Sequence, residues 1–135
     1  RAHYGVDFAA AKGSPIWSTA PGKVVFVGNK GGYGKTIILQ HGGQYQTIYA
    51  HMSQYAKRIK AGDPVKQKQV IGYVGSTGHA TGPHLHYELR LKGKPIDPLR
   101  AKLPKKAALK GDMLDAFKQY QAHIIKQLNV KSMKK

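Results

Sequence analysis

Short apolar runs punctuated by glycine and proline fill the chain as far as residue 98, and this spacing sets the narrowest limit on the possible folds. Runs of about four to eight residues between turn-forming residues are typical of strands and too short for most helices. His41-Gly42-Gly43-Gln44 separates two such runs and predicts a hairpin, because its glycines can adopt positive φ. The stretch 53–60 is ambiguous and is compatible with a helical turn. We expect strands at 24–27, 36–39, 46–49, 70–74 and 84–91 and therefore a mainly β, antiparallel domain.

The composition changes after Pro98, which sets a predicted boundary near residue 100. Residues 101–135 contain nine lysines and two aspartates and form a basic tail with a net charge of +7. Apolar side chains recur in this tail at three- and four-residue steps, which predicts an amphipathic helix over about 112–128 with Asp112 as its N-cap. Such a helix either docks on its own or a neighbouring domain, or binds a membrane surface or nucleic acid. Its apolar stripe consists of Leu114, Phe117, Tyr120, Ile124 and Leu128.

The charge of the whole chain is strongly unbalanced. Lys and Arg number 23 and Asp and Glu number 6, which gives a formal net charge of +17. Such a protein is attracted to polyanions, namely nucleic acid, anionic lipid or the acidic polymers of a bacterial wall. The absence of cysteine excludes disulfides, cysteine-ligated zinc sites and a thiol nucleophile. No apolar run reaches about 18 residues, so we expect no membrane-spanning helix within these residues.

Four histidines and one aspartate form a pattern that suits a metal site. His3 and Asp7 are separated by three residues near the start of the sequence. His84 and His86 are separated by one residue within a predicted strand, and because side chains alternate along a strand, both imidazoles face the same way. His51 follows an apolar run and therefore lies near the end of a predicted strand, where a cleft can form.

Zinc chemistry gives these residues a common purpose. A catalytic zinc ion takes about three protein ligands and keeps one position for water. His3, Asp7 and one of His84 or His86 fill that requirement, and the spacing alone does not decide which of the pair is the ligand. His51 and the other member of the pair are then available for proton transfer or for a hydrogen bond to an oxyanion. No HExxH motif is present, so the usual glutamate base is missing.

Three other histidines and one glutamate stay outside this predicted site. His79 belongs to the small-residue loop 75–82, whose composition would allow an extended polymer to approach the backbone closely. His41, in the predicted hairpin turn, and His123, in the predicted helix, are expected at the surface. Glu88 lies on the same strand face as the histidine pair, where it either orients an imidazole from behind or pairs with one of the many lysines.

Three segments, in this order within residues 1 to about 100, resemble the lysostaphin/LytM-like peptidoglycan endopeptidases: His3-x-x-x-Asp7, Tyr49-Ala50-His51-Met52-Ser53 and Gly82-Pro83-His84-Leu85-His86-Tyr87-Glu88. The resemblance implies that zinc is bound by His3, Asp7 and His86. It implies that His51 and His84 are the general base and the oxyanion-stabilising histidine. The implied fold is a two-layered antiparallel β domain, the LytM-like duplicated hybrid motif, with the zinc groove between loops. Residues 1–100 would be this domain in an N-terminally truncated form.

The resemblance also implies an activity. Family members cleave the peptide cross-links of the bacterial wall, so the chain is expected to be a zinc metallo-endopeptidase acting on peptidoglycan peptide stems. Segments 2–10 and 73–78 look more like the Gram-negative branch, which implies D-Ala–diaminopimelate bonds, a D,D-endopeptidase, rather than glycine bridges. The expected location is the periplasm or cell envelope, after export of a longer precursor of the kind that carries a membrane anchor. Regulatory protein partners are compatible with this interpretation.

Three rival functions account for parts of the sequence. Some family members have lost ligands and are catalytically inactive activators or wall-binding domains, but all five expected positions are filled here. Segments 61–65 and 70–75 are similar to hairpins of lipoyl or biotinyl carrier domains, although the Met-Lys turn of those domains is absent. A nucleic-acid-binding module explains the charge but not the histidines, and basic residues do not alternate with aromatics along one face. We therefore predict no nucleic-acid partner.

Overall fold

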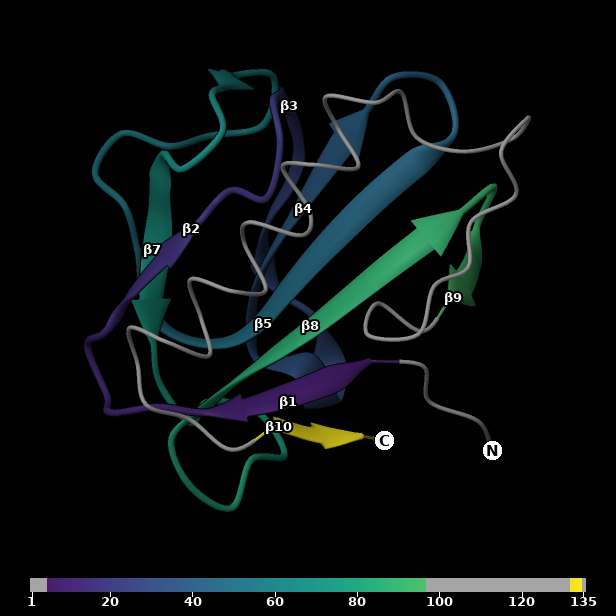
Figure 1. Ribbon diagram of the computed structural model, residues 1–135. Coiled ribbons are helices and arrows are strands. Elements are labelled where there is room, and N and C mark those ends of the chain that lie inside the picture. The colour runs from purple at the N-terminus through teal and green to yellow at the C-terminus, as the bar shows by residue number, and fades with distance from the viewer. Residues whose placement is uncertain (1–4, 97–131, 135) are drawn as a thin grey trace.

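The computed structural model describes residues 5–96 and 132–134 and consists of antiparallel strands (Figure 1). The prediction of a mainly antiparallel β domain is confirmed. The predicted helix at about 112–128 lies outside the described residues. One short 3-10 helix, η1 (Gly31–Tyr33), precedes β4. The strands are β1 (Val6–Ala9), β2 (Pro15–Trp17), β3 (Gly22–Asn29), β4 (Lys35–His41), β5 (Tyr45–Tyr55), β6 (Pro64–Val65), β7 (Val70–Val74), β8 (His84–Leu91), β9 (Lys94–Ile96) and β10 (Ser132–Lys134).

The strands form one hydrogen-bonded network with the order β10-β1-β8-β5-β4-β3-β6. Strand β9 pairs with β8, and β2 pairs with β7, which branches from β5. The long strand β5 makes this branch possible, since its first part pairs with β4 and β8 while its last residues pair with β7. Figure 1 shows the β2–β7 ribbon to the left of the diagonal strands β5 and β8. The point at which β5 leaves one set of partners for the other is therefore a corner of the fold.

Sequence patterns located the longer strands and missed the shorter ones. Each of the five predicted strands lies within an observed strand, namely β3, β4, β5, β7 or β8. The helical turn allowed for residues 53–60 is wrong, because β5 continues to Tyr55 and pairs there with Gly72 of β7. No helix among the described residues is long and apolar enough to cross a membrane.

One face of β8 packs on the hydrophobic core, so the side chains on its other face are directed away from the core. Leu85, Tyr87 and Leu89 alternate along β8 and are almost fully buried. A buried side chain of this size stabilises the fold by about 1.5–3 kcal/mol. The buried hydroxyls of Tyr49 and Tyr87 both contact Thr19 Oγ1, at 3.0 and 2.8 Å. The alternate residues of β8 consequently face away from the core. The core also contains Phe8, Ile16, Val24, Ile37, Leu39, Ile71 and Val74.

His41 is buried, and its predicted surface position is wrong. It is the last residue of β4 rather than part of the turn, and only 2% of its surface is exposed. Its Nδ1 lies 2.8 Å from the Pro21 carbonyl oxygen, and its Nε2 lies 2.7 Å from Thr47 Oγ1. Since a carbonyl only accepts, Nδ1–H donates to Pro21, and in the neutral ring Nε2 accepts from the Thr47 hydroxyl. Burial lowers the pKa of His41 below its usual value, partly offset by the hydrogen bond to Pro21.

We expect this buried imidazole to make the stability of the domain pH-dependent. Because the pKa of His41 is lower in the folded than in the unfolded chain, the unfolded state binds more protons below about pH 6.5. The free energy of unfolding should therefore fall as the pH is lowered from about 7 to about 5. In His41→Gln this fall should be smaller, as measured by urea denaturation at each pH. Equal pH slopes for the two proteins would contradict the assignment, whatever their difference in absolute stability.

Candidate metal centre

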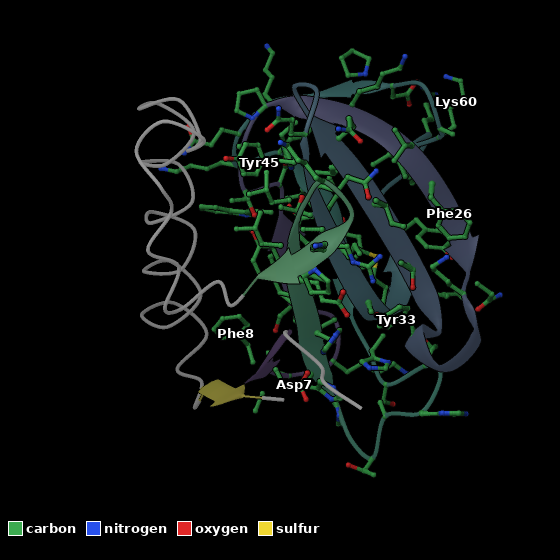
Figure 2. The ribbon with its side chains drawn as sticks, turned by 90° about the vertical axis from the view of Figure 1, so that its right-hand side faces the viewer. Asp7, Phe8, Phe26, Tyr33, Tyr45 and Lys60 are labelled. Carbon is green, nitrogen blue, oxygen red and sulfur yellow. The ribbon has the colours of Figure 1, made fainter. Side chains whose placement is uncertain are left out.

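Asp7 and His86 face each other across two adjacent strands. They are direct partners in the β1–β8 register, on the face of β8 opposite the core. Asp7 Oδ1 lies 2.7 Å from His86 Nδ1 and 3.6 Å from His84 Nε2. Both Asp7 and His86 are buried. In Figure 2, Asp7 and Tyr33 lie toward the lower end of the molecule, away from Tyr45 and Lys60. The strand register, rather than nearness in sequence, brings this carboxylate and this imidazole together.

His51 joins the cluster from the corner of β5. Its φ of 61° is in the left-handed region, which a residue with a Cβ adopts at an energetic cost. Its Nδ1–H donates to the Thr77 carbonyl oxygen at 2.7 Å, which leaves Nε2 as the acceptor nitrogen of the neutral ring. The centroid of its ring lies 4.7 Å from that of His84 and 5.9 Å from that of His86. Burial lowers the pKa of His51, partly offset by the hydrogen bond to Thr77, which favours the neutral form.

His84 is held in the same manner. Its Nδ1–H donates to the Gly82 carbonyl oxygen at 2.9 Å, so its Nε2 is the nitrogen directed at Asp7. Its side chain is 14% exposed, compared with 5% for that of His86. Two histidines thus offer Nε2 atoms beside the Asp7–His86 pair, and each is oriented by a backbone carbonyl.

The two ring nitrogens of His86 both face carboxylates. Nδ1 is directed at Asp7, and Nε2 lies 2.8 Å from Glu88 Oε2. Although burial lowers it, hydrogen bonds to Asp7 and Glu88 raise the pKa of His86 to about 9. Although burial raises it, hydrogen bonds from His86, Tyr33 and Arg90 lower the pKa of Glu88 to about 2. The charged side chains of this site therefore pair with one another: His86 contacts both Asp7 and Glu88, and Glu88 also contacts Arg90.

Four of the five predicted site residues meet in space, namely Asp7, His51, His84 and His86, and His3 lies outside the described residues. Among the residues that the structure does describe, no group of three His, Cys, Asp or Glu side chains meets the geometry of a metal site. The donor chemistry nevertheless fits zinc, because a carboxylate oxygen and an imidazole nitrogen face each other and the second nitrogen of that imidazole contacts a carboxylate. A catalytic zinc ion takes about three protein ligands, and the third one that we predict is His3.

At two of its glycines, Gly75 and Gly78, the loop 75–82 packs against other parts of the chain, which corrects our interpretation for these two positions. Gly78 has a φ of 74°, and a Cβ there would lie 2.4 Å from the backbone of Gly32 and of Gly34. A Cβ on Gly75 would lie 2.4 Å from the Ser53 backbone nitrogen. These two glycines therefore allow contact between protein loops rather than room for a polymer. Thr77, between them, donates through Oγ1 to the Met52 carbonyl and thereby holds the carbonyl that orients His51.

Gly78→Ala should destabilise the domain by about 2 kcal/mol or more, since both the left-handed backbone and the 2.4 Å contacts oppose a side chain. Gly82→Ala is the matched control in the same loop, because a Cβ there meets nothing within 4 Å. The measurement is the free energy of unfolding from denaturant titration. Similar stabilities for the two variants would show that the close approach of these loops has no energetic role.

Comparisons with known proteins agree with this geometry. The profile of peptidase family M23 matches residues 1–98. The DD-carboxypeptidase/endopeptidase Mpg of Neisseria meningitidis is 45% identical over 104 residues, which are 77% of this chain and 24% of that protein. The chain thus spans about a quarter of the length of the curated relatives that it first matches.

Two solved structures are similar at 39% identity. The catalytic domain of the antimicrobial peptidase lysostaphin from Staphylococcus simulans gives a TM-score of 0.67 and covers 72% of this chain and 76% of its own. A zinc-containing peptidase from Vibrio cholerae gives a TM-score of 0.70 and covers 76% of this chain and 31% of its own. The resemblance to lysostaphin/LytM-like endopeptidases is confirmed, and the chain belongs to peptidase family M23.

Proposed function

We propose that this chain is the catalytic domain of a zinc-dependent endopeptidase that hydrolyses peptide cross-links of bacterial peptidoglycan at D-Ala–diaminopimelate bonds. The observation that carries the proposal is the convergence of Asp7 with three imidazoles in a chain of family M23. Several relatives are named peptidoglycan DD-endopeptidases, which favours this bond over a glycine bridge. The chain keeps Asp7, His51, His84 and His86, which favours an enzyme over an inactive activator.

Three residues would hold the zinc ion: His3, Asp7 and His86. Asp7 and His86 supply a carboxylate oxygen and Nδ1 from adjacent strands, already directed at each other. A zinc ion bound there would supply Lewis acidity, which lowers the pKa of a water molecule and polarises the scissile carbonyl. Burial of both side chains excludes bulk water and strengthens their attraction for a cation.

His51 and His84 would carry the protons of the reaction. Each has its Nδ1–H on a backbone carbonyl, so each presents Nε2 to the reacting groups. One Nε2 accepts a proton from the attacking water and passes it to the leaving amine as the C–N bond breaks. The other, when protonated, donates a hydrogen bond to the oxygen that gains negative charge. The fixed carbonyl partners hold both rings in place, so little reorganisation is needed.

We place the protein in the periplasm or cell envelope, where its substrate lies. The net charge of +17 attracts it to the free carboxylates of the wall. The division into residues 1–100 and a basic tail, a membrane anchor in a longer precursor and regulatory protein partners stay predictions.

Digestion of purified sacculi tests the proposal. The zinc-loaded chain should convert diaminopimelate-cross-linked dimers into monomers with a new D-Ala carboxyl group and a new diaminopimelate amine, as identified by mass spectrometry. A chelator should stop the reaction and added zinc should restore it. Release of glycine-bridge fragments instead would overturn the bond assignment. A zinc-saturated chain that cleaves neither type of wall would overturn the enzymatic function.

A further inference from the structure

Glu88 is a buried acid for which the sequence left two roles open: orienting an imidazole or pairing with a lysine. Only 2% of its surface is exposed, and it follows His86 by two residues on the same face of β8. A buried carboxylate is costly unless it is paired and hydrogen-bonded. The structure provides this pairing through His86, Tyr33 and Arg90 rather than through a lysine.

Each oxygen of Glu88 has its own donors. Oε1 accepts from Arg90 Nε at 3.1 Å and from an Arg90 terminal nitrogen at 2.9 Å. Oε2 accepts from the Tyr33 hydroxyl at 2.5 Å and lies 2.8 Å from His86 Nε2. The same terminal nitrogen of Arg90 lies 3.3 Å from the Tyr33 hydroxyl, which closes the network. Arg90 and Tyr33 thus hold the Glu88 carboxylate in place. Its Oε2 also contacts His86 Nε2.

The geometry assigns Glu88 to the far side of the His86 ring. Asp7 meets Nδ1, whereas Glu88 meets Nε2 of the same imidazole. When a cation takes the lone pair on Nδ1, the neutral imidazole keeps a single N–H on Nε2, and the Glu88 carboxylate, which only accepts, lies 2.8 Å away to receive that hydrogen bond. Glu88 is therefore placed to orient the ligand rather than to act as a ligand itself.

Two further contacts restrict the ring. Tyr33 stacks on His86 with a centroid distance of 5.6 Å and an interplanar angle of 26°. A Cβ on Gly5 would lie 2.3 Å from His86 Cε1 and 3.0 Å from Glu88 Cγ, so the backbone of Gly5 lies directly against the pair. The ring has little room to rotate, and its hydrogen bond to Glu88 selects one orientation.

We propose that Glu88, held by Tyr33 and Arg90, is a positioning residue that fixes the tautomer and orientation of His86 so that Nδ1 is available to the metal. This inference rests on the proposed zinc site. Carboxylate partners of metal-bound histidines raise metal affinity by about 10- to 100-fold. Losing Glu88 should therefore weaken zinc binding by about that factor, without removing any predicted zinc ligand.

The test uses the full chain and measures zinc affinity by competition with a chelator. In Glu88→Gln we expect zinc affinity to fall by about 10-fold or more, since the amide also places a donor against Tyr33 and Arg90. Tyr33→Phe keeps the stacked ring and removes only the hydroxyl, so it should weaken zinc binding less, in the same direction. Asp63→Asn is the charge-matched control, because Asp63 pairs with Lys60 at the surface.

A second readout separates positioning from stability. The visible spectrum of the cobalt-substituted chain should change in Glu88→Gln and stay constant in Asp63→Asn, because the spectrum reports ligand geometry. Unchanged zinc affinity and cobalt spectrum in Glu88→Gln, with only the melting temperature lowered, would overturn the inference while leaving the proposed function intact. If Glu88→Gln does not fold, Tyr33→Phe decides, and an unchanged affinity there overturns the inference. Wild-type chain that binds no zinc would overturn both.

Discussion

His86→Ala is expected to abolish stoichiometric zinc binding, and wall cleavage with it. His86 is one of two predicted ligands in the described part of the chain, and it contacts Asp7 Oδ1 at 2.7 Å. A zinc site with three protein ligands that loses one should weaken by more than about 100-fold, the upper range for loss of an outer partner. Metal content after gel filtration measures the effect. Asp7→Asn, which nearly preserves side-chain volume, should give the same loss.

The matched control is His79→Ala. His79 is an exposed histidine of the neighbouring loop, and its contact with Gly32 O is made by its backbone nitrogen, which the substitution retains. This variant should keep one zinc ion per chain and full cleavage. Because His86→Ala removes a partner from two buried carboxylates, Asp7 and Glu88, the melting temperature of the variant must be recorded as well. A folded His86→Ala or Asp7→Asn chain that retains zinc at wild-type affinity would contradict the ligand assignment.

His84→Ala and His51→Ala are expected to retain zinc and lose cleavage. Both histidines present Nε2 beside the Asp7–His86 pair, and neither is predicted to bind the metal. Loss of a positioned acid or base costs typically about 10²- to 10⁴-fold in rate, so each variant should fall within that range. The double variant should be little worse than the worse single one, because residues that act in one step are strongly non-additive.

The measurement is the initial rate of muropeptide release from sacculi, with zinc content determined on the same samples. His79→Ala again serves as the control for loss of an imidazole near the site. A His84→Ala chain that cleaves at the wild-type rate would remove His84 from the mechanism, and the same holds for His51. Loss of zinc from His84→Ala would instead make His84 the ligand of the pair.

The face of β8 that carries the site could be predicted from the sequence, because strand alternation is a local property. His84 and His86 share one face, and Leu85 and Tyr87 lie in the core behind them, as the alternation requires. The partner of His86 could not be found in this way. Asp7 belongs to a strand of four residues, and its place opposite His86 depends on the β1–β8 register. The number of ligands that a zinc ion needs grouped Asp7 with one of His84 and His86, and only the family resemblance selected His86.

Other features depended on contacts that no local pattern encodes. The Tyr33 hydroxyl donates a hydrogen bond to Glu88, 55 residues away in sequence, and no local pattern near Glu88 predicts this contact. The glycines of loop 75–82 indicated a close approach to the backbone correctly, but the approaching group is the loop that contains Gly32 and Gly34. His41 was expected at the surface because it precedes two glycines, whereas the strand before the turn carries it inward to Pro21.

Diffraction from crystals of the zinc-loaded chain, with anomalous data at the zinc absorption edge, tests the central claim most directly. We predict one anomalous peak at about 2.0–2.2 Å from His86 Nδ1 and from a carboxylate oxygen of Asp7, with His3 completing the protein ligands. His51 and His84 should lie beside the ion without binding it. A peak elsewhere in the molecule, or a zinc-saturated crystal with no peak between Asp7 and His86, would contradict the account.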